Sequence, residues 1–511
     1  MKMLNTTQRL AIVLSCTFVI GLTIFVTYPH AEELLESYTI SYYRYTPSQK
    51  VLSTKVDLSN AEPAIAVPIL MYHGVTHEQD NDNTNINRFI EHMEMLKIEG
   101  YETITLQQFE EFLKDKYTLP PRPIIITFDD GRKDSYFTTD DIFRKLEFKA
   151  TIFMVSGKAN DRDKFYLGWH DLKTMSTSGR WDIQAHGTYS HDKILIDEFG
   201  NTGRFLTSLQ YIDQRLETVP EYETRVEKDY IQNIEDFDTH LGYKPKYYAI
   251  PINEYGENIV SNYPQAGVFN TQLMKKYFSL AFIEGYVYQP GDEYSRVYNK
   301  PIYNFQDVNP YRVSRIEPKN MDAENLKKLL ESNAPHTLPY TISFNDIDKM
   351  KTDAILAYGN MDIQENGLHL ISVPGEESAK VLFGDENWSN YTVTAEFTWV
   401  SGRSIVLLGY ANDDKNYFAF GITDGGVFIR ETVHGIEQDL RPPFLGYVSL
   451  PKDTTLKLVF DNNKVNAYID DRAMYTGITT SFTTGEVGFK TWDDKGNGEG
   501  ILHSLTVTET K

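Results

Sequence analysis

The pattern of hydrophobic and polar positions changes once within the body of the chain. From Val67 to about residue 335, short apolar runs alternate with stretches of helical periodicity. Uninterrupted apolar runs are typical of strands buried on both faces, and their alternation with helices predicts β/α units around a mostly parallel sheet. After about residue 340 the helical periodicity ends. Short alternating strands separated by turn residues predict an all-β sandwich there, of the jelly-roll kind.

Each region yields a set of expected elements. The expected strands of the first region are Val67–Tyr72, Ile124–Phe128, Ala150–Val155, Trp181–Ala185, Tyr247–Ile250, Phe278–Phe282 and Tyr311–Ile316. Its expected helices are Asn87–Glu99, Thr105–Lys114 with Thr105 as N-cap, Ser135–Leu146 and Asp322–Ser332. The expected strands of the sandwich are Leu368–Val373, Tyr391–Val400, Ser404–Tyr410, Tyr417–Ile422, Val427–Arg430, Thr455–Phe460, Lys464–Ile469, Gly485–Lys490 and Ser504–Thr508.

The N-terminus carries an uncharged apolar run, Leu10–Tyr28, of about the 19 residues that cross the hydrocarbon core of a bilayer. Lys2 and Arg9 precede the run and Glu32 follows it, so the positive-inside rule places the rest of the chain outside the cell. The alternative is a cleaved signal peptide. The run is long for that, and no small-x-small cleavage site follows it. We therefore expect an uncleaved transmembrane anchor.

Four segments follow from these patterns. We expect a cytoplasmic tip and anchor over 1–30, a stalk, linker or edge element over 31–65, a β/α domain over 66–335 and a β-sandwich over 336–511. The single cysteine lies inside the apolar run, which excludes an intrachain disulfide and a thiol-based site in the folded part. An exported chain without disulfides fits a Gram-positive surface.

The net charge of −22 argues against nucleic acid as a partner, because its phosphates would be repelled. The same charge is consistent with simple solubility, or with a substrate that becomes cationic when it gains amines.

Asp129 and Asp130 directly follow the expected strand Ile124–Phe128. Two adjacent carboxylates repel each other unless a cation or a shared proton relieves them. A metal ion held by one would leave the other free to act as a general base, and Gly131 would allow the chain to turn. An ordinary Asp-Asp-Gly turn explains the same residues equally well.

A pair of histidines, His186 and His191, follows the expected strand Trp181–Ala185. Two imidazoles in one loop can close on one ion together with a carboxylate, although exposed loop histidines are also ordinary. With Asp130 they form a candidate metal site with an open position for water. The carboxyl ends of β/α strands are where such folds place their active sites. His73, Pro251, Asn253 and Glu284 follow other expected strands and share this location; of these, His73, Pro251 and Asn253 are candidate substrate contacts.

Three motifs carry a family resemblance: Ile69-Leu70-Met71-Tyr72-His73, then Thr127-Phe128-Asp129-Asp130-Gly131, then the pair His186 and His191. They resemble the NodB-homology polysaccharide deacetylases (carbohydrate esterase family 4) over about residues 66–335. The most similar branch acts on exopolysaccharides, either poly-N-acetylglucosamine or the Pel polymer. The resemblance implies a distorted (β/α) barrel.

The resemblance also implies roles for these residues. Asp129 would be the general base, and Asp130, His186 and His191 would hold a divalent metal, with zinc as the default and nickel, cobalt or iron as alternatives. The metal would activate a water and polarise the acetamide carbonyl.

Two departures from the family pattern change this picture. The usual arginine before the third-motif proline, which tethers the base, is absent before Pro251. Arg315 lies near a strand end, so it is a candidate to replace this arginine as the tether of the base and to line the substrate site. The alternative is a surface salt bridge. The late Leu-x-His acid motif is absent too. The general acid is therefore unassigned; His73 is a candidate, with a structural role below the site as the alternative.

The C-terminal region resembles concanavalin-like or laminin-G-like jelly rolls, through Trp388-Ser389-Asn390-Tyr391-Thr392-Val393 and Asn416-Tyr417-Phe418-Ala419-Phe420-Gly421. Such modules often bind sugars on aromatic faces. Trp388, Trp399, Tyr410 and Trp492 are the candidates, and core packing is the alternative for all four. Acidic turns of this region could also bind calcium. Turn chemistry alone explains the same acidic residues equally well.

The sequence thus predicts a membrane-anchored, metal-dependent N-deacetylase of an extracellular poly-N-acetylhexosamine in biofilm matrix production. Its expected partners are the acetylated polysaccharide, the membrane, and exopolysaccharide synthase or export proteins. Peptidoglycan or chitin-oligomer deacetylation is the alternative among enzymes. A catalytically degenerate barrel that binds glycan in the matrix is the non-enzymatic alternative.

Overall fold

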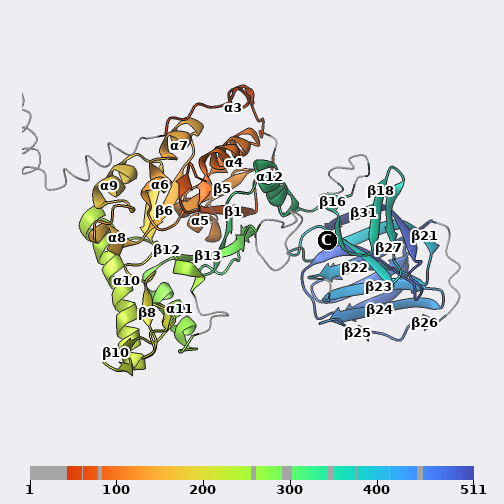
Figure 1. Cartoon of the computed structure of the whole chain (residues 1–511). Helices are drawn as coiled ribbons and strands as arrows, with labels where there is room; N and C mark the ends of the chain where they lie inside the picture. Colours follow the sequence, from red (N-terminus) through yellow and green to blue (C-terminus); the bar gives the residue numbers. More distant parts are fainter. Residues whose placement is uncertain are drawn as a thin grey trace, which may run out of the picture. The chain divides into compact units, whose positions relative to one another are not determined.

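The computed structural model describes residues 43–510 except 60, 79–82, 255–260, 290–301, 343, 345–349, 351–352, 376, 414 and 446–452. The chain divides into two compact units (Figure 1). One comprises Met1–Gly291 with Asn304–Glu324, and the other comprises Asp292–Tyr303 with Asn325–Lys511. The sequence-based domain bounds, 66–335 and 336–511, remain predictions.

The first unit is built on seven parallel strands that close into a ring, in the order β1-β15-β13-β12-β7-β6-β5 and back to β1. These strands are β1 (Ala66–Tyr72), β5 (Pro123–Phe128), β6 (Ala150–Met154), β7 (Trp181–Ala185), β12 (Tyr247–Ala249), β13 (Leu280–Val287) and β15 (Val313–Glu317). Every residue of β1, β5 and β6 is buried, as the uninterrupted apolar runs predict. The parallel β/α barrel is thereby confirmed. Its carboxyl strand ends meet at one face.

Helices expected from periodicity are present with small shifts of their ends. They are α4 (Ile86–Ile98), α5 (Leu106–Leu113), α6 (Lys133–Tyr136), α7 (Asp140–Leu146) and α12 (Ala323–Ser332). Thr105 caps α5 through a reciprocal capping box with Gln108. The single helix expected over 135–146 is wrong, because the chain breaks between α6 and α7. There the hydroxyls of Thr138 and Thr139 bond back to the carbonyls of Asp134 and Ser135, which competes with helix propagation.

The segments between β7 and β12 and between β12 and β13 hold elements that the sequence analysis missed. Two short hairpins come first, followed by a long helix, and α11 (Ala266–Tyr277) then leads into β13. The hairpin strands are β8 (Lys193–Leu195), β9 (Thr202–Arg204), β10 (Tyr211–Ile212) and β11 (Arg215–Leu216). The long helix is α10 (Val219–Leu241), which begins at a capping box between Thr218 and Glu221 and ends at Gly242 in the left-handed region. These end signals are readable in the sequence.

Part of the predicted stalk belongs to the barrel unit. Tyr45 is 2% exposed, and its hydroxyl donates to Glu94 of α4. Its backbone N–H donates to Asp141 of α7 at 2.9 Å. From Tyr43 onward, including α3 (Gln49–Ser53), the chain is therefore an edge element rather than a free linker.

The predicted transmembrane anchor, residues 10–28, lies outside the described residues. Among the helices that the structure describes, none combines the length and the apolar composition needed to cross a bilayer.

The second unit consists of two antiparallel sheets, as the alternating pattern predicts. One sheet runs β18-β19-β31-β21-β27-β28-β29 with β16 beside β31, and the other runs β17-β20-β30-β22-β23-β24-β25 with β26 beside β24. Their bounds are β16 (Tyr340–Thr341), β17 (Ile355–Tyr358), β18 (Asn360–Gln364), β19 (Gly367–Ile371), β20 (Ser378–Phe383), β21 (Tyr391–Ser401), β22 (Ser404–Ala411), β23 (Tyr417–Thr423), β24 (Gly426–Val433), β25 (Ile436–Asp439), β26 (Phe444–Leu445), β27 (Asp453–Asp461), β28 (Lys464–Ile469), β29 (Arg472–Thr479), β30 (Glu486–Trp492) and β31 (Glu499–Glu509). Apolar side chains from both sheets form one core.

The aromatic residues proposed as sugar contacts in this unit separate into two groups. Trp388 and Tyr410 belong to the buried core, and Trp399 packs against its edge. Trp492 instead lines a cavity on the other face of its sheet, with Tyr417 and Phe428. The core alternative therefore holds for Trp388 and Tyr410.

A buried histidine joins helix α4 to the barrel. His92 accepts the hydroxyl hydrogen of Tyr72 at Nδ1, 3.0 Å away, and its Nε2–H donates to the carbonyl of Met321 at 2.7 Å. This assignment uses the neutral ring. Burial penalises the charged ring and lowers the pKa of His92 to about 4.

Acidification should therefore weaken this unit through His92. Because the folded pKa lies below the unfolded value of about 6.5, the stabilisation is complete above pH 6.5 and is lost as the pH falls toward 4, a difference of roughly 3 kcal/mol. Denaturant unfolding at a series of pH values measures it. His92→Gln should be less stable at pH 7 but lack this slope, whereas His170→Gln on the surface should keep it. Equal slopes in all three proteins would contradict this account.

Candidate functional site

Two strand ends of the barrel bring together three side chains that could hold a metal ion. Asp130 follows β5, while His186 and His191 follow β7, and their ligand atoms all lie within 4.8 Å of one another. The two Nε2 atoms are 2.8 Å apart, and Asp130 Oδ1 lies 3.7 Å from that of His186 and 3.5 Å from that of His191. Among the described residues this is the one such cluster of histidine, cysteine and acidic side chains.

The protonation of the two rings suits a metal ion. The Nδ1–H of His186 donates to the carbonyl of Ala249 at 2.8 Å, which leaves the Nε2 lone pair facing the cluster. Burial, together with the charge of His186, lowers the pKa of His191 to about 4, so its ring is neutral. Two imidazole nitrogens and one carboxylate are the donor set that zinc and its neighbours prefer.

Backbone turns aim these side chains. Asp130 and Gly131 have φ of 72° and 75°, so the chain reverses immediately after β5. A Cβ on Gly131 would lie 2.8 Å from Met154 Cβ. Gly187 has φ of 80°, and a Cβ there would overlap the Ser190 hydroxyl at 1.7 Å. Glycine at both positions therefore fits turns that a larger residue would disrupt.

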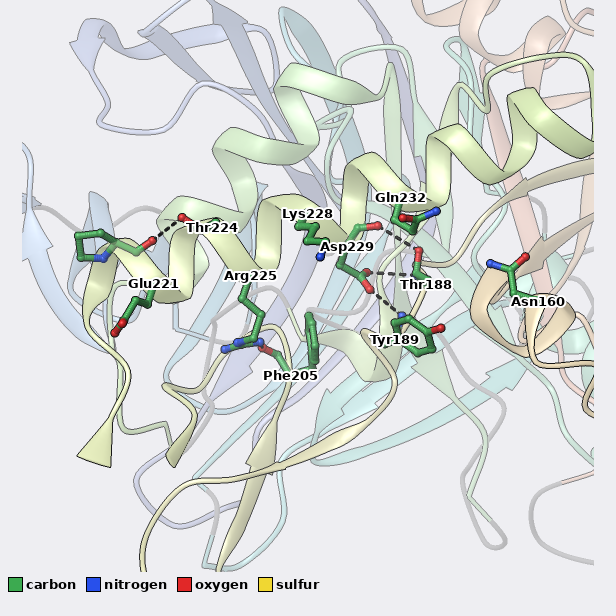
Figure 2. A pocket seen from close by; sticks show the side chains of 11 residues that line it. Asn160, Thr188, Tyr189, Phe205, Glu221, Thr224, Arg225, Lys228, Asp229 and Gln232 are labelled. Atoms are coloured by element: carbon green, nitrogen blue, oxygen red, sulfur yellow. Dashed lines mark hydrogen bonds between the residues drawn. The ribbon is translucent and has the colours of Figure 1, made fainter. Parts of the chain in front are cut away.

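Helix α10 holds the loop that carries the two histidines. The carboxylate of Asp229 accepts the backbone N–H groups of Thr188 at 3.1 Å and Tyr189 at 2.6 Å (Figure 2). One turn further along, Asn233 donates to the carbonyl of Gly187 at 2.8 Å. Burial raises the pKa of Asp229 to about 6, although the two N–H groups oppose the shift.

The sequence analysis missed Asp229 and Asn233. The signal was present, because both are polar residues on the helix face that otherwise carries buried Tyr222, Val226 and Tyr230.

Asp129 is paired with the arginine that the sequence placed as a replacement tether. Arg315 Nη1 lies 2.6 Å from Oδ1 of Asp129, and Nη2 lies 2.8 Å from Oδ2. The side chains are 0% and 2% exposed, so this is not a surface salt bridge. Burial would raise the pKa of Asp129, but the charges of Arg315 and His186 outweigh it and hold the pKa well below its usual range.

A cavity of about 380 Å³ opens onto these groups. It is lined by His73, Asp129, Asp130, Val155, Lys158, Tyr166, His186, His191, Asp192, Ile252 and Glu284. His73 Nδ1 lies 3.0 Å from a carboxylate oxygen of Glu317. Burial would lower the pKa of His73, but Glu317 and the two aspartates raise it to about 9. Burial raises the pKa of Glu284.

The structure does not bring Pro251 and Asn253 to the cavity wall. The side-chain amide of Asn253 donates to the backbone carbonyl of Glu284 at 2.9 Å and accepts its backbone N–H at 3.1 Å. Its polar atoms therefore bond to the neighbouring strand. Ile252 takes the place at the cavity wall, with φ of 52°. This left-handed conformation turns the side chain of Ile252, which lies between Pro251 and Asn253, toward the site. Pro251 and Asn253 therefore stay predicted substrate contacts that do not line this cavity.

Residues 116–270 match the family model described as polysaccharide deacetylase. This region is a polysaccharide deacetylase domain. The matched segment holds Asp129, Asp130, His186 and His191. His73 and Arg315 lie outside the matched segment. His73 follows β1, which is next to β5 in the ring, and Arg315 belongs to β15, which is next to β13.

Two curated relatives are similar over part of this domain. The putative polysaccharide deacetylase YxkH of Bacillus subtilis is 32% identical over 133 residues, which is 26% of this chain and 46% of the relative. The poly-beta-1,6-N-acetyl-D-glucosamine N-deacetylase of Staphylococcus epidermidis is 26% identical over 159 residues, 30% of this chain and 53% of the relative. The chain thus spans about half the length of these relatives.

Among solved structures, a de-N-acetylase from Aggregatibacter actinomycetemcomitans is 20% identical, with a TM-score of 0.42. The match covers 52% of this chain and all of that one.

Metal affinity of the deacetylase domain should depend on the ligands and on the helix behind them. His191→Ala removes a ligand and should abolish stoichiometric zinc binding. Asp229→Ala frees the loop and should weaken it by roughly 10- to 100-fold, the usual cost of losing a group that orients metal ligands. Titration calorimetry with zinc measures both. His170→Ala, on the surface of α9 (Trp169–Thr177), is the control. Affinity unchanged in His191→Ala would contradict the assignment.

Proposed function

We propose that the protein removes acetyl groups from an extracellular poly-N-acetylhexosamine in a metal-dependent hydrolysis that releases acetate. One observation carries the proposal: a carboxylate locked on a buried arginine lies beside three metal-binding side chains at the floor of one cavity. The name of the Staphylococcus relative supports poly-β-1,6-N-acetylglucosamine as the substrate class.

Asp130, His186 and His191 would hold the metal, most readily zinc, with nickel, cobalt or iron as alternatives. When bound, the ion supplies Lewis acidity toward the acetamide carbonyl and toward a water. Asp129 takes the proton from that water. Each of its oxygens accepts one N–H from Arg315 and keeps a second lone pair for this purpose. As the water loses this proton, its oxygen bonds to the acetamide carbon; the C–N bond then breaks while the nitrogen accepts a proton, so that acetate and an amine leave.

His73 is the proposed general acid. Its Nδ1 is held by Glu317, and the ring lines the same cavity as the base and the metal ligands. With Nδ1 fixed in this way, Nε2 is the atom left to give a proton to the leaving amine. The missing late histidine of the family pattern is thus replaced by a residue that follows the first strand.

The proposal extends to the cell. A single-pass anchor over residues 10–28 would hold the catalytic part outside, beside a nascent polymer, where synthase or export proteins of biofilm matrix production would be its partners. Peptidoglycan and chitin oligomers are the competing substrates. A degenerate, purely glycan-binding barrel is disfavoured because binding alone needs neither the paired base nor the metal ligands.

Acetate release should require both the metal and Asp129. A fragment without the predicted anchor should release acetate from acetylated glucosamine or galactosamine oligomers when zinc is present. In this fragment, Asp129→Asn should lower kcat by at least about 100-fold, the contribution of a general base. Asp238→Asn, exposed near the end of α10, should match wild type. Enzymatic acetate detection measures all three.

No metal-dependent release from any acetylated glycan, peptidoglycan included, would overturn the proposed function. Release that survives Asp129→Asn unchanged would overturn the assignment of the base instead.

Arg315→Lys tests the positioning of Asp129. Lysine keeps the positive charge but cannot hold both oxygens at once. We expect kcat to fall by roughly 10- to 100-fold, the size of the change that misplacing a reacting group by about 1 Å produces. KM and zinc affinity should change little. An equal loss of zinc affinity would show that the arginine maintains the whole site rather than the base.

A further inference from the structure

A second, larger cavity borders the metal cavity. Its volume is about 880 Å³, at the upper end of the range of about 300–1,000 Å³ common for ligand pockets. Thr188 and Tyr189, between the two metal-site histidines, form one end of it. Asn160 of α8 (Ser156–Asn160) lines it too, whereas Lys158 of the same helix lines the metal cavity. The two cavities therefore share two walls, the histidine loop and α8. We call the larger one the α10 groove.

One face of helix α10 forms the long wall of this groove. Its side chains follow helical spacing, and Figure 2 shows them along the helix toward Thr188 and Tyr189: Glu221, Thr224, Arg225, Lys228 and Gln232. From Glu221 to Gln232 the helix rises by about 16 Å at 1.5 Å per residue. The groove is thus longer than a single sugar and leads away from the metal site.

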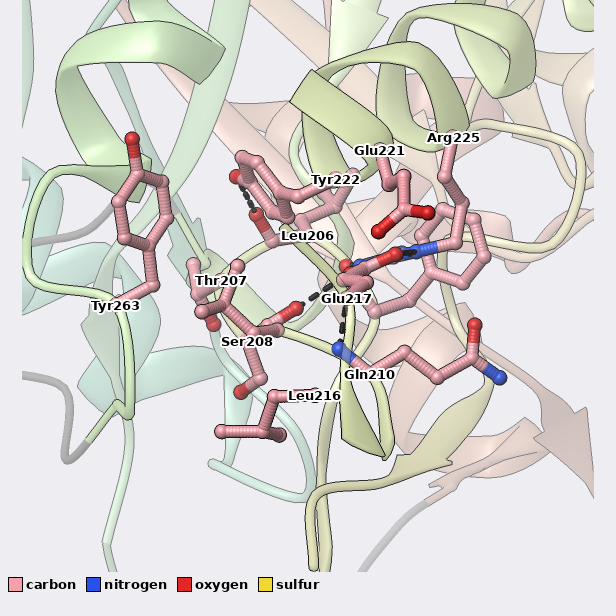
Figure 3. Close-up of polar contacts among 12 residues, drawn as sticks. Leu206, Thr207, Ser208, Gln210, Leu216, Glu217, Glu221, Tyr222, Arg225 and Tyr263 are labelled. Atoms are coloured by element: carbon pink, nitrogen blue, oxygen red, sulfur yellow. Dashed lines mark hydrogen bonds and ion pairs between the residues drawn. The ribbon is translucent and has the colours of Figure 1, made fainter. Parts of the chain in front are cut away.

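The wall opposite α10 is fixed by a network around Arg225. Its guanidinium bonds the carboxylate of Glu217 and the carbonyls of Phe205 and Ser208, and its carbon lies 4.5 Å from the centre of the Phe205 ring. Tyr222 also donates to the carbonyl of Leu206 at 2.6 Å (Figure 3). The segment that follows the first hairpin is therefore fastened to α10, and the groove does not need a ligand to form it.

The groups left facing the groove suit a neutral sugar chain. Tyr189 is 42% exposed, so its ring can stack on the apolar face of a sugar. Lys228 is exposed, and among the described residues its ammonium has no ion-pair partner, so it can donate to hydroxyl or acetamide oxygens. The other charges are used internally, because Glu221 pairs with Arg215 and Asp229 holds the histidine loop.

We propose that the α10 groove is an extended subsite that holds still-acetylated, non-reacting sugars of the same polysaccharide chain that has another of its residues over Asp129 and Asp130. This inference rests on the proposed function. It makes a polymer rather than a short oligomer the true substrate, because sugars in the groove add binding energy that a dimer cannot reach. The groove adjoins the metal cavity on the other side of the histidine loop, where Tyr189 is exposed, so one polymer chain that crosses this loop would reach both cavities.

Chain-length dependence of binding tests the proposal. The Asp129→Asn protein, loaded with zinc, is titrated calorimetrically with β-1,6-linked N-acetylglucosamine oligomers of two to eight sugars. We expect affinity to rise with length. Thr224→Trp, which fills the groove from an exposed helix position, should reduce the gain from dimer to octamer by about tenfold or more, equivalent to about 1.4 kcal/mol. Lys228→Ala should reduce the same gain by a smaller factor.

Two matched variants control for bulk and charge. Asp238→Trp adds the same ring beyond the groove on α10, and Lys244→Ala removes an exposed lysine after the helix; both should keep the full gain. An equal gain in Thr224→Trp and its parent, or equal affinity of the parent for dimer and octamer, would overturn the groove while leaving acetate release intact. If no oligomer binds and the wild-type protein releases no acetate, the proposed function falls and the inference falls with it.

Discussion

The buried ion pair between Arg315 and Asp129 is the constraint on which the site depends. Removing either partner would leave a charge in the barrel with no counter-charge, at a cost of about 3–5 kcal/mol. Both oxygens of Asp129 are bonded to Arg315, and its carboxylate lies 3.8 Å from His186 Nε2. Among the described residues Asp130 has no such partner, and it lies within 3.7 Å of both histidines, so it is the carboxylate of the candidate metal cluster. In the proposed mechanism, this bidentate contact is what would give two chemically identical neighbours different roles.

The histidine loop depends on a second set of buried polar contacts. Asp229 and Asn233 hold its backbone from helix α10, while Ser156 of α8 donates its backbone N–H to Gly187. The same helix forms the wall of the α10 groove. Positioning of the metal ligands and binding of a long chain would therefore share one structural element.

Much of the site was predictable because its residues lie in contiguous motifs directly after buried strands. Asp129, Asp130, His186 and His191 needed only the position of a strand end. Arg315 lies far from them along the chain, and its place followed from parallel topology, which puts all carboxyl strand ends at one face.

What the sequence could not give depends on tertiary contacts or on local backbone turns. Asp229 and Asn233 stand out in the sequence as polar residues on the apolar face of α10, but their partners in the histidine loop follow only from the packing of that helix on the loop. The left-handed turn at Ile252 exchanges the side chain that reaches the cavity, which no periodicity rule foresees. The break between α6 and α7 likewise depends on which carbonyls the two threonine hydroxyls find.

Anomalous diffraction from zinc-loaded crystals tests the division of roles most directly. The account predicts one peak at about 2.0–2.2 Å from Nε2 of His186, Nε2 of His191 and a carboxylate oxygen of Asp130, with Asp129 still bonded to Arg315. A zinc ion ligated by Asp129, with Arg315 displaced from its carboxylate, would contradict it.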